Sequence, residues 1–83
     1  MPKTIFSGAN RAVVEVIRQA RQAAGLTQGE LATLIGRDQS HISLIEGSQR
    51  RLDVVEFHEI ARALGCDPVA LFGEVAKRLD TGL

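Results

Sequence analysis

A chain of 83 residues that is 45% hydrophobic, with no Trp or Tyr, is long enough for one small domain. Its core must be built mainly from Ala, Val, Ile and Leu, and few turn signals interrupt it, which favours an all-α fold. The single cysteine excludes an internal disulfide, and no apolar run approaches the roughly 18–20 residues of a membrane span. With no apolar block of signal-peptide length at the N-terminus, the expectation is a soluble cytoplasmic protein.

The formal net charge is zero, but the charges are unevenly distributed along the chain. Through Arg51 there are seven basic and four acidic residues, whereas from Leu52 onward there are three basic and six acidic residues. A neutral protein has little overall attraction for nucleic-acid phosphates, but the basic N-terminal part is compatible with it. The overall neutrality therefore hides a polarised molecule.

Residues 1–7 are expected to form an N-terminal arm. Its apolar pair, Ile5 and Phe6, either folds back on the domain or pairs across a dimer, and Ser7 is a candidate helix cap. A helix is predicted from Gly8 to Ala24, ended by Gly25. Helical spacing places four residues on its buried face: Val13, Ile17, Ala20 and Ala24.

The stretch TQGELATLIGRDQSHISLIE has the pattern of two short helices joined by a tight turn. Thr27 and Glu30 form a capping box that opens a helix from Gln28 to Ile35. Gly36 ends this helix, and Asp38 is expected to cap the next one, Gln39 to Glu46. The predicted inward side chains are Leu31, Ala32, Ile35, Ile42 and Ile45. This is the pattern of a helix-turn-helix, in which the second helix can enter a DNA groove.

Polar residues occupy the outer face of that second helix. Gln39, Ser40 and Ser43 lie opposite the core residues, together with Leu44. Gln can bond bidentately to adenine, and Ser can donate or accept at a base edge. Such residues also occur on ordinary helix surfaces, but the capped helix and glycine turn before them favour a role in reading bases.

The remainder of the chain predicts a polar loop and two further helices. The loop, Gly47 to Arg51, carries two cations, and Asp53 is expected to cap a helix that ends at Gly65. The predicted core residues of this helix are Val54, Phe57, Ile60, Ala61 and Leu64. Asp67 and Pro68 open a last helix to about Leu79, because proline is tolerated at the first helical position.

The last helix carries an apolar stripe made of Leu71, Phe72, Val75, Ala76 and Leu79. The stripe is longer than the closing helix of a minimal domain needs, so we predict a dimer surface of the self-complementary kind used for two-fold DNA sites. The alternative is that the stripe covers the core of its own chain. The predicted organisation is one domain over residues 1–83, with an arm (1–7), a four-helix core (8–65) and a dimerisation helix (67–79).

From Ile17 to Phe72 the chain resembles the Cro/C1-type (Xre-type) helix-turn-helix family of small bacterial and phage repressors. The matching residues are Ile17–Arg21, Gly25–Ala32, Gly36, Gln39-Ser40, Ile42-Ser43, Ile45-Glu46 and Ala61–Gly65. The resemblance implies a five-helix, lambda-repressor-like domain with the helix from Gln39 to Glu46 in the major groove.

The resemblance also implies roles for single residues. Gln39, Ser40 and Ser43 would lie at or near base edges. Leu44, which the family pattern does not explain, suggests either contact with a thymine methyl group or a weaker grip on phosphate. Phosphate contacts would come from Gln28, Arg37, His41, Arg50 and Arg51, although His41 also suits a structural role. Arg21 and Glu46 would form a buried ion pair between the first helix and the end of the reading helix.

Three positions depart from the family pattern. The family usually has its loop glycine one residue after Gly47, which favours a rearranged loop backbone here. Leu44 stands at a position that is often polar or basic, and Asp38 places a negative charge near the expected DNA surface. The last two departures favour weaker DNA affinity, without affecting the fold.

The sequence contains no metal-binding or catalytic pattern. Cys66, His41 and His58 lack the spacing of metal ligands, and Cys66 suits core packing. We therefore predict a transcriptional repressor without cofactors that binds a two-fold-related DNA operator as a homodimer. The alternative is a protein-interaction module of the same fold, such as an antitoxin or antiactivator. Zero net charge, Leu34 and Leu44 favour that alternative.

Overall fold

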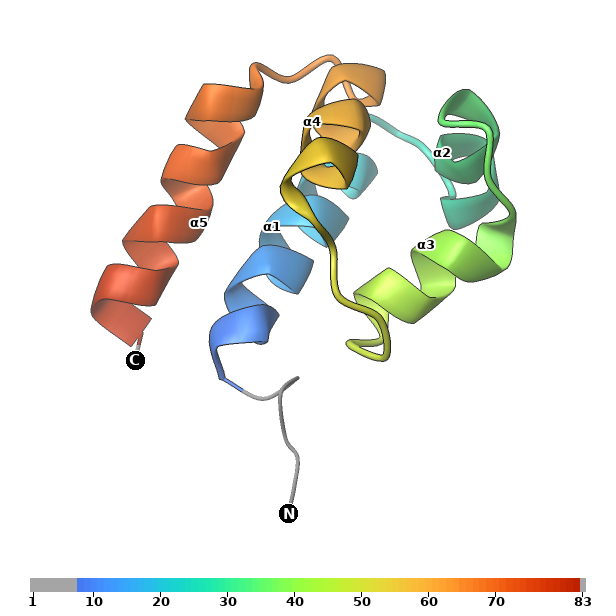
Figure 1. Cartoon of the computed structure of the whole chain (residues 1–83). Helices are drawn as coiled ribbons and strands as arrows, with labels where there is room; N and C mark the ends of the chain where they lie inside the picture. Colours follow the sequence, from blue (N-terminus) through green and yellow to red (C-terminus); the bar gives the residue numbers. More distant parts are fainter. Residues whose placement is uncertain (1–7, 83) are drawn as a thin grey trace.

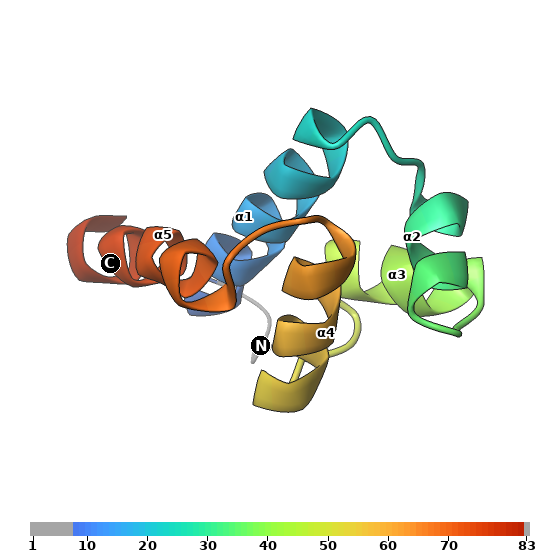
Figure 2. The ribbon, with the colours of Figure 1, turned by 90° about the horizontal axis from the view of Figure 1, so that it is seen from above.

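The computed structural model describes residues 8–82, and within this range it consists of five α-helices and no strand. They are α1 (Ala9–Ala23), α2 (Gln28–Leu34), α3 (Gln39–Glu46), α4 (Val54–Ala63) and α5 (Pro68–Gly82). Helices α1 and α5 are antiparallel and form one side of the molecule. Helices α2 and α3 form the other side, and α4 lies between the two pairs (Figures 1 and 2). None of these helices combines the length and apolar content required to cross a membrane.

Two apolar clusters hold the helices together. The larger one joins α1, α2, α3 and α4, and its fully buried large side chains are Ile17, Leu31, Ile42, Ile45 and Ile60. The smaller one joins α1 to α5 through Ala12, Val16 and Val75. Because α1 contributes to both clusters, it connects the helix-turn-helix on one side with α5 on the other.

The helix boundaries agree with the sequence prediction to within a few residues. The capping box of Thr27 and Glu30 is present, with both reciprocal hydrogen bonds formed. Asp53 caps α4 as predicted, and Glu56 completes a second capping box that the sequence analysis did not identify. Asp38 occupies the cap position of α3, but its side chain makes no capping hydrogen bond. The predictions for Ser7 and for the arm with Ile5 and Phe6 lie outside the described residues.

Two predicted core positions are wrong. Ala24 is exposed, because α1 ends one residue earlier and leaves Ala24 in the turn. Val54 is 83% exposed, because the first residue of α4 borders a surface groove and does not face the core. Conversely, Val14 and Val16 are buried although the sequence analysis did not place them in the core. Val16 packs in the second cluster with Ala12 and Val75, so a single stripe does not describe the packing of α1.

The apolar stripe of α5 needs the largest correction. Val75 is only 1% exposed, because it packs against Ala12 and Val16 of α1. Leu71 and Leu79 are half-buried against the same cluster, and Ala76 is also half-buried. The stripe therefore mostly covers the core of its own chain, which was the alternative interpretation. Only Phe72 remains exposed, at 51%.

The loop after α3 contains one residue with a left-handed backbone conformation, and this residue is a serine and not a glycine. Gly47 has a φ of −86°, whereas Ser48 has a φ of 59°. Ser48 is the residue at which the resembling family usually has its glycine. A serine therefore adopts here the backbone conformation that glycine adopts more easily.

Two glycine substitutions test the helix assignments in opposite directions. Gly36 ends α2 with a φ of +72°, and an added Cβ would have no heavy atom within 4 Å. Gly36→Ala should therefore lower the free energy of unfolding by about 1 kcal/mol through backbone strain alone. Gly73 lies inside α5 with equally open space, so Gly73→Ala should raise it by about 0.5–1 kcal/mol. Urea denaturation measures both, and shifts of the same sign would contradict the assignments.

Candidate nucleic-acid interface

The reading helix α3 is held by its apolar face and leaves its polar face outside. Ile42 and Ile45 are 0% and 1% exposed and pack against Leu31 and Ala32 of α2. The turn between the helices is closed by Gly36, whose positive φ allows the N–H of Arg37 to reach the carbonyl of Ala32 at 2.8 Å. This close packing gives α2 and α3 their helix-turn-helix arrangement.

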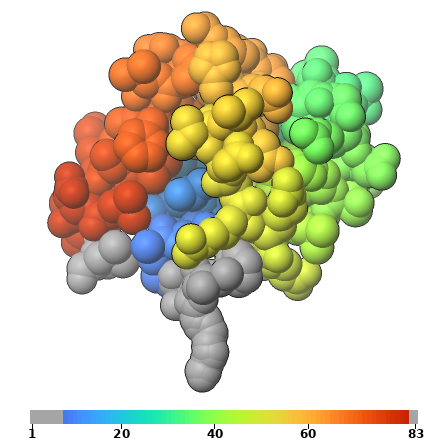
Figure 3. All heavy atoms as spheres, viewed as in Figure 1, coloured from blue at the N-terminus to red at the C-terminus, as the bar shows by residue number. Residues whose placement is uncertain are grey.

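The four predicted base-contacting residues are all exposed on α3: Gln39, Ser40, Ser43 and Leu44. Leu44 exposes 40% of its surface. The segment that contains them, coloured light green, lies on the outer surface at the lower right of Figure 3. The exposed side of α3 is therefore a polar helix face with one apolar side chain, Leu44.

The ion pair predicted between Arg21 and Glu46 is present. The Nε of Arg21 donates to Glu46 Oε2 at 2.7 Å, and its Nη2 donates to Oε1 at 3.0 Å. Glu46 is buried, and it also accepts from Gln28 Nε2 at 3.0 Å. A bidentate, charge-assisted pair of this kind fixes both distance and orientation.

Arg21 and Arg18 also donate hydrogen bonds to the surrounding backbone. Arg21 Nη1 donates to the carbonyl of Leu26 at 2.7 Å, which fixes the connection between α1 and α2. Arg18 Nη2 donates to the carbonyl of Glu46 at 3.0 Å, where the C-terminal end of α3 concentrates partial negative charge. Glu46 and its partners, Arg18, Arg21 and Gln28, are called the Glu46 network below.

The Glu46 network keeps its acid and base ionised. Burial by itself raises the pKa of Glu46, but hydrogen bonds from Arg21 and Gln28, with the charges of Arg21 and Arg18, outweigh it and leave this pKa below its usual value. The hydrogen bond to Glu46 raises the pKa of Arg21, although burial opposes it. The pair is therefore fully charged at neutral pH.

A second buried carboxylate, Glu56, lies beside the loop that follows α3. Its Oε2 is 2.6 Å from Arg50 Nη2, and its Oε1 accepts from the N–H of Asp53 at 3.2 Å. His41 Nε2 lies 3.2 Å from the same Oε2, but its direction does not satisfy hydrogen-bond geometry. Glu56 was not among the predicted site residues, although the sequence contains the capping-box spacing Asp53-x-x-Glu56.

The predicted phosphate-contacting residues have different surroundings. Arg37 and Arg51 are exposed. The side chain of Arg50 is paired with Glu56, and that of Gln28 with Glu46. The side chain of His41 is only 13% exposed and faces α4. A phosphate contact by His41 does not fit this inward orientation, because its imidazole is not on the surface with the base-facing residues.

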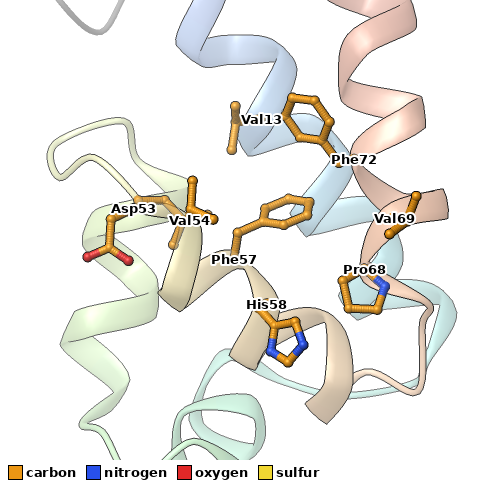
Figure 4. Close-up of a pocket in the computed structure, with 9 residues that line it drawn as sticks. Val13, Asp53, Val54, Phe57, His58, Pro68, Val69 and Phe72 are labelled. Atoms are coloured by element: carbon orange, nitrogen blue, oxygen red, sulfur yellow. The ribbon is translucent and has the colours of Figure 1, made fainter.

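A second exposed feature is an apolar groove between α4 and α5, with a volume of about 470 Å³ (Figure 4). It is lined mainly by Val13, Leu52, Val54, Phe57, Pro68, Val69 and Phe72, and we call it the α4–α5 groove. Phe57 points from α4 toward Phe72, and the rings meet edge to face at 6.0 Å and 87°. Val69 is 80% exposed at its rim, and neighbouring Val55 on α4 is 67% exposed.

Comparison with known proteins supports the assignment of α2 and α3 as a helix-turn-helix. A family model described as a helix-turn-helix domain matches residues 12–72. The solved structure of an XRE-family like protein from Pseudomonas syringae pv. tomato str. DC3000 is 43% identical, with a TM-score of 0.78, over 83% of this chain and 84% of that one.

Two restriction-modification controller proteins are also similar. C.AhdI from Aeromonas hydrophila is 35% identical, with a TM-score of 0.70, over 76% of this chain and 91% of that one. The C.Esp1396I tetramer in complex with its natural 35 base-pair operator has a chain that is 26% identical, with a TM-score of 0.78. That match covers 95% of this chain and 100% of the other.

The Glu46 network predicts a pH-dependent loss of stability. Glu46→Gln leaves Arg21 without its charge partner and should lower the free energy of unfolding at pH 7 by about 3–5 kcal/mol. Because the pKa of Glu46 is lowered by folding, its contribution is complete above the ordinary value of 4.5 and is lost as the pH falls through the folded-state value. Urea denaturation between pH 7 and pH 3 should therefore show the two proteins converging in acid.

The matched control is Glu74→Gln. Glu74 pairs with Lys77 at 3.3 Å on the exposed surface of α5, so its replacement should change stability little. Equal stabilities of the wild type and Glu46→Gln at pH 7 would show that the Glu46 network does not brace α3.

Proposed function

Since the chain belongs to the XRE-type helix-turn-helix family of DNA-binding transcriptional regulators, we propose that it represses transcription as a homodimer on a two-fold-related operator. In this proposal α3 of each protomer enters the major groove of one half-site. Repression is steric, because a protein bound at a promoter excludes the polymerase.

The observation that carries this proposal is the exposed polar face of α3 on a rigidly held helix. Gln39, Ser40 and Ser43 have short or medium side chains that permit close approach of the helix to base edges. Leu44 offers an apolar contact of the kind that a thymine methyl group accepts. The Glu46 network holds the other end of the helix, so the angle of α3 to the rest of the domain is set before binding.

Phosphate contacts would come from basic residues on either side of α3. Arg37 precedes the helix, and Arg50 and Arg51 follow it in the loop. The N-terminus of α2, beginning at Gln28, would add the partial positive charge of a helix end. These groups explain how a chain of zero net charge would still attract DNA locally.

The second copy of this chain is the partner we propose for the α4–α5 groove. The supporting relative, C.Esp1396I, binds its operator as a tetramer. A two-fold axis through the groove would pair Val69 and Phe72 with their counterparts, burying side chains that are 80% and 51% exposed in one protomer. This interface replaces the α5 stripe of the sequence prediction, since Val75 is already buried.

A protein-interaction module of the same fold remains the rival function. It is favoured by Leu34 on α2, which is 59% exposed, and by Leu44 on α3. The two functions can be distinguished by how the binding affinity depends on salt concentration. DNA affinity should fall steeply as salt rises, because each neutralised phosphate releases counterions.

Selection of bound sites from random DNA tests the proposed function. We expect palindromic sites with half-site centres about 10–11 base pairs apart, as a symmetric dimer requires. Gln39→Ala should change the preference at one position of each half-site, whereas Arg51→Ala should weaken all sites alike. Failure to enrich any sequence, with no binding even at low salt, would reject the function in favour of the protein-interaction module.

Introduction of a charge into the α4–α5 groove tests the dimer. Val69→Asp should shift the protein to a monomer in sedimentation at tens of micromolar, because an unpaired carboxylate would otherwise be buried. Val69 is so exposed in one protomer that the fold should survive, which circular dichroism can verify. Leu34→Asp is the control, since it adds the same charge to the exposed surface of α2. An unchanged dimer in Val69→Asp would place the interface elsewhere.

A further inference from the structure

Glu56 joins three parts of the chain at one carboxylate group. Its Oε2 lies 2.6 Å from Arg50, which belongs to the loop after α3, and 3.2 Å from Nε2 of His41, which belongs to α3 itself. Its Oε1 is occupied by the N–H of Asp53 at the start of α4. One buried negative charge therefore has two basic neighbours.

The two basic neighbours, Arg50 and His41, differ in exposure and in hydrogen bonding to Glu56. Arg50 makes the hydrogen bond to Glu56, and 40% of its side chain is exposed. The imidazole of His41 is largely buried, and its Nε2 has no hydrogen-bond partner among the described residues. An unsatisfied buried polar atom of this kind needs an explanation.

Glu56 is the charged residue in contact with His41 Nε2, and charged residues of the neighbouring helices α1 and α2 have partners elsewhere. Glu30 of α2 is engaged with the N–H of Thr27, and Arg21 of α1 is engaged with Glu46. Arg50 is the other charge at this site, and it faces the imidazole across the same oxygen of Glu56. The charge that His41 experiences thus depends on whether Arg50 stays at Glu56.

This inference rests on the proposed function, in which Arg50 contacts a DNA phosphate. When Arg50 turns to the phosphate, Glu56 loses its cation while it remains buried, which is unfavourable. A protonated His41 would supply both a positive charge and an Nε2–H donor to the same oxygen. Imidazole is the side chain that gains or loses its proton between about pH 5 and 8, so solvent can supply that proton under ordinary conditions.

We propose that DNA binding by this protein is linked to uptake of one proton at His41, with Glu56 passing from the Arg50 guanidinium to the His41 imidazolium. The one bond formed in this exchange is the N–H bond that turns the His41 imidazole into an imidazolium. The proton comes from solvent, Arg50 exchanges one anion for another, and Glu56 keeps a cationic partner throughout. His41 acts through Glu56 and is a positioning residue, which never touches the DNA itself.

The test is operator affinity at constant ionic strength from pH 8 to pH 6, using DNA obtained by the selection described above. For the wild type, affinity should rise as the pH falls, by up to about tenfold per pH unit for one linked proton. Calorimetry in two buffers of different ionisation enthalpy should independently show uptake of up to one proton per bound protomer. Constant salt matters because phosphate contacts respond strongly to ionic strength.

Three variants separate the exchange from a structural role. His41→Gln should abolish the proton uptake, and Arg50→Gln should weaken binding and abolish it too, because no cation then leaves Glu56. His58→Gln removes the exposed histidine of α4, which lines the α4–α5 groove and can therefore change the affinity itself. The slope of its log affinity against pH should still equal that of the wild type. If His41→Gln fails to fold, the Arg50→Gln protein still decides the matter.

Two results would overturn the linkage. One is pH-independent binding by the wild type, and the other is proton uptake that persists in His41→Gln or Arg50→Gln. DNA binding would still be observed in both cases, so the proposed function would stand. Absence of DNA binding at every pH would instead overturn the proposed function and this linkage together.

Discussion

The buried carboxylate of Glu46 is the constraint on which the arrangement of this molecule depends. It gathers donors from α1 and from the start of α2 onto the last residue of α3, with the shortest distance 2.7 Å. Removing any one partner leaves charge or hydrogen-bonding capacity unsatisfied in a buried place, so the three helices resist independent movement. Apolar packing alone is less directional. The Glu46 network therefore sets the angle at which α3 meets its surroundings.

The second organising feature is the double role of α1. One side of α1 packs with Ile17 into the helix-turn-helix core, and another side packs with Val16 against Val75 of α5. Helices α3 and α5 lie on opposite sides of α4 (Figures 1 and 2), so the exposed face of α3 and the α4–α5 groove are distinct surfaces of one domain. A dimer formed through the groove would carry two copies of α3 at a fixed separation, which is what half-site recognition requires.

Local features could be predicted from the sequence, but which side of each helix is covered by another helix could not. Thr27 with Glu30 and the turn at Gly36 are signals contained in a few neighbouring residues, and they specified the helix-turn-helix correctly. Val75 shares a helical stripe with Phe72, yet only Val75 is covered by α1, because periodicity does not reveal which element lies opposite. The pairing of Arg50 with Glu56 was missed for a related reason, since each residue alone resembles an ordinary surface charge.

The central claim is that the pair of Arg21 and Glu46 orients α3 for DNA. A double-mutant cycle on operator affinity tests it most directly, using Arg21→Gln, Glu46→Gln and the double variant at a temperature where circular dichroism shows all of them folded. The account predicts that each single substitution weakens binding by about tenfold or more, and that the double variant binds no worse than the weaker single variant. Unchanged affinity in a folded single variant, or effects that simply add, would contradict it.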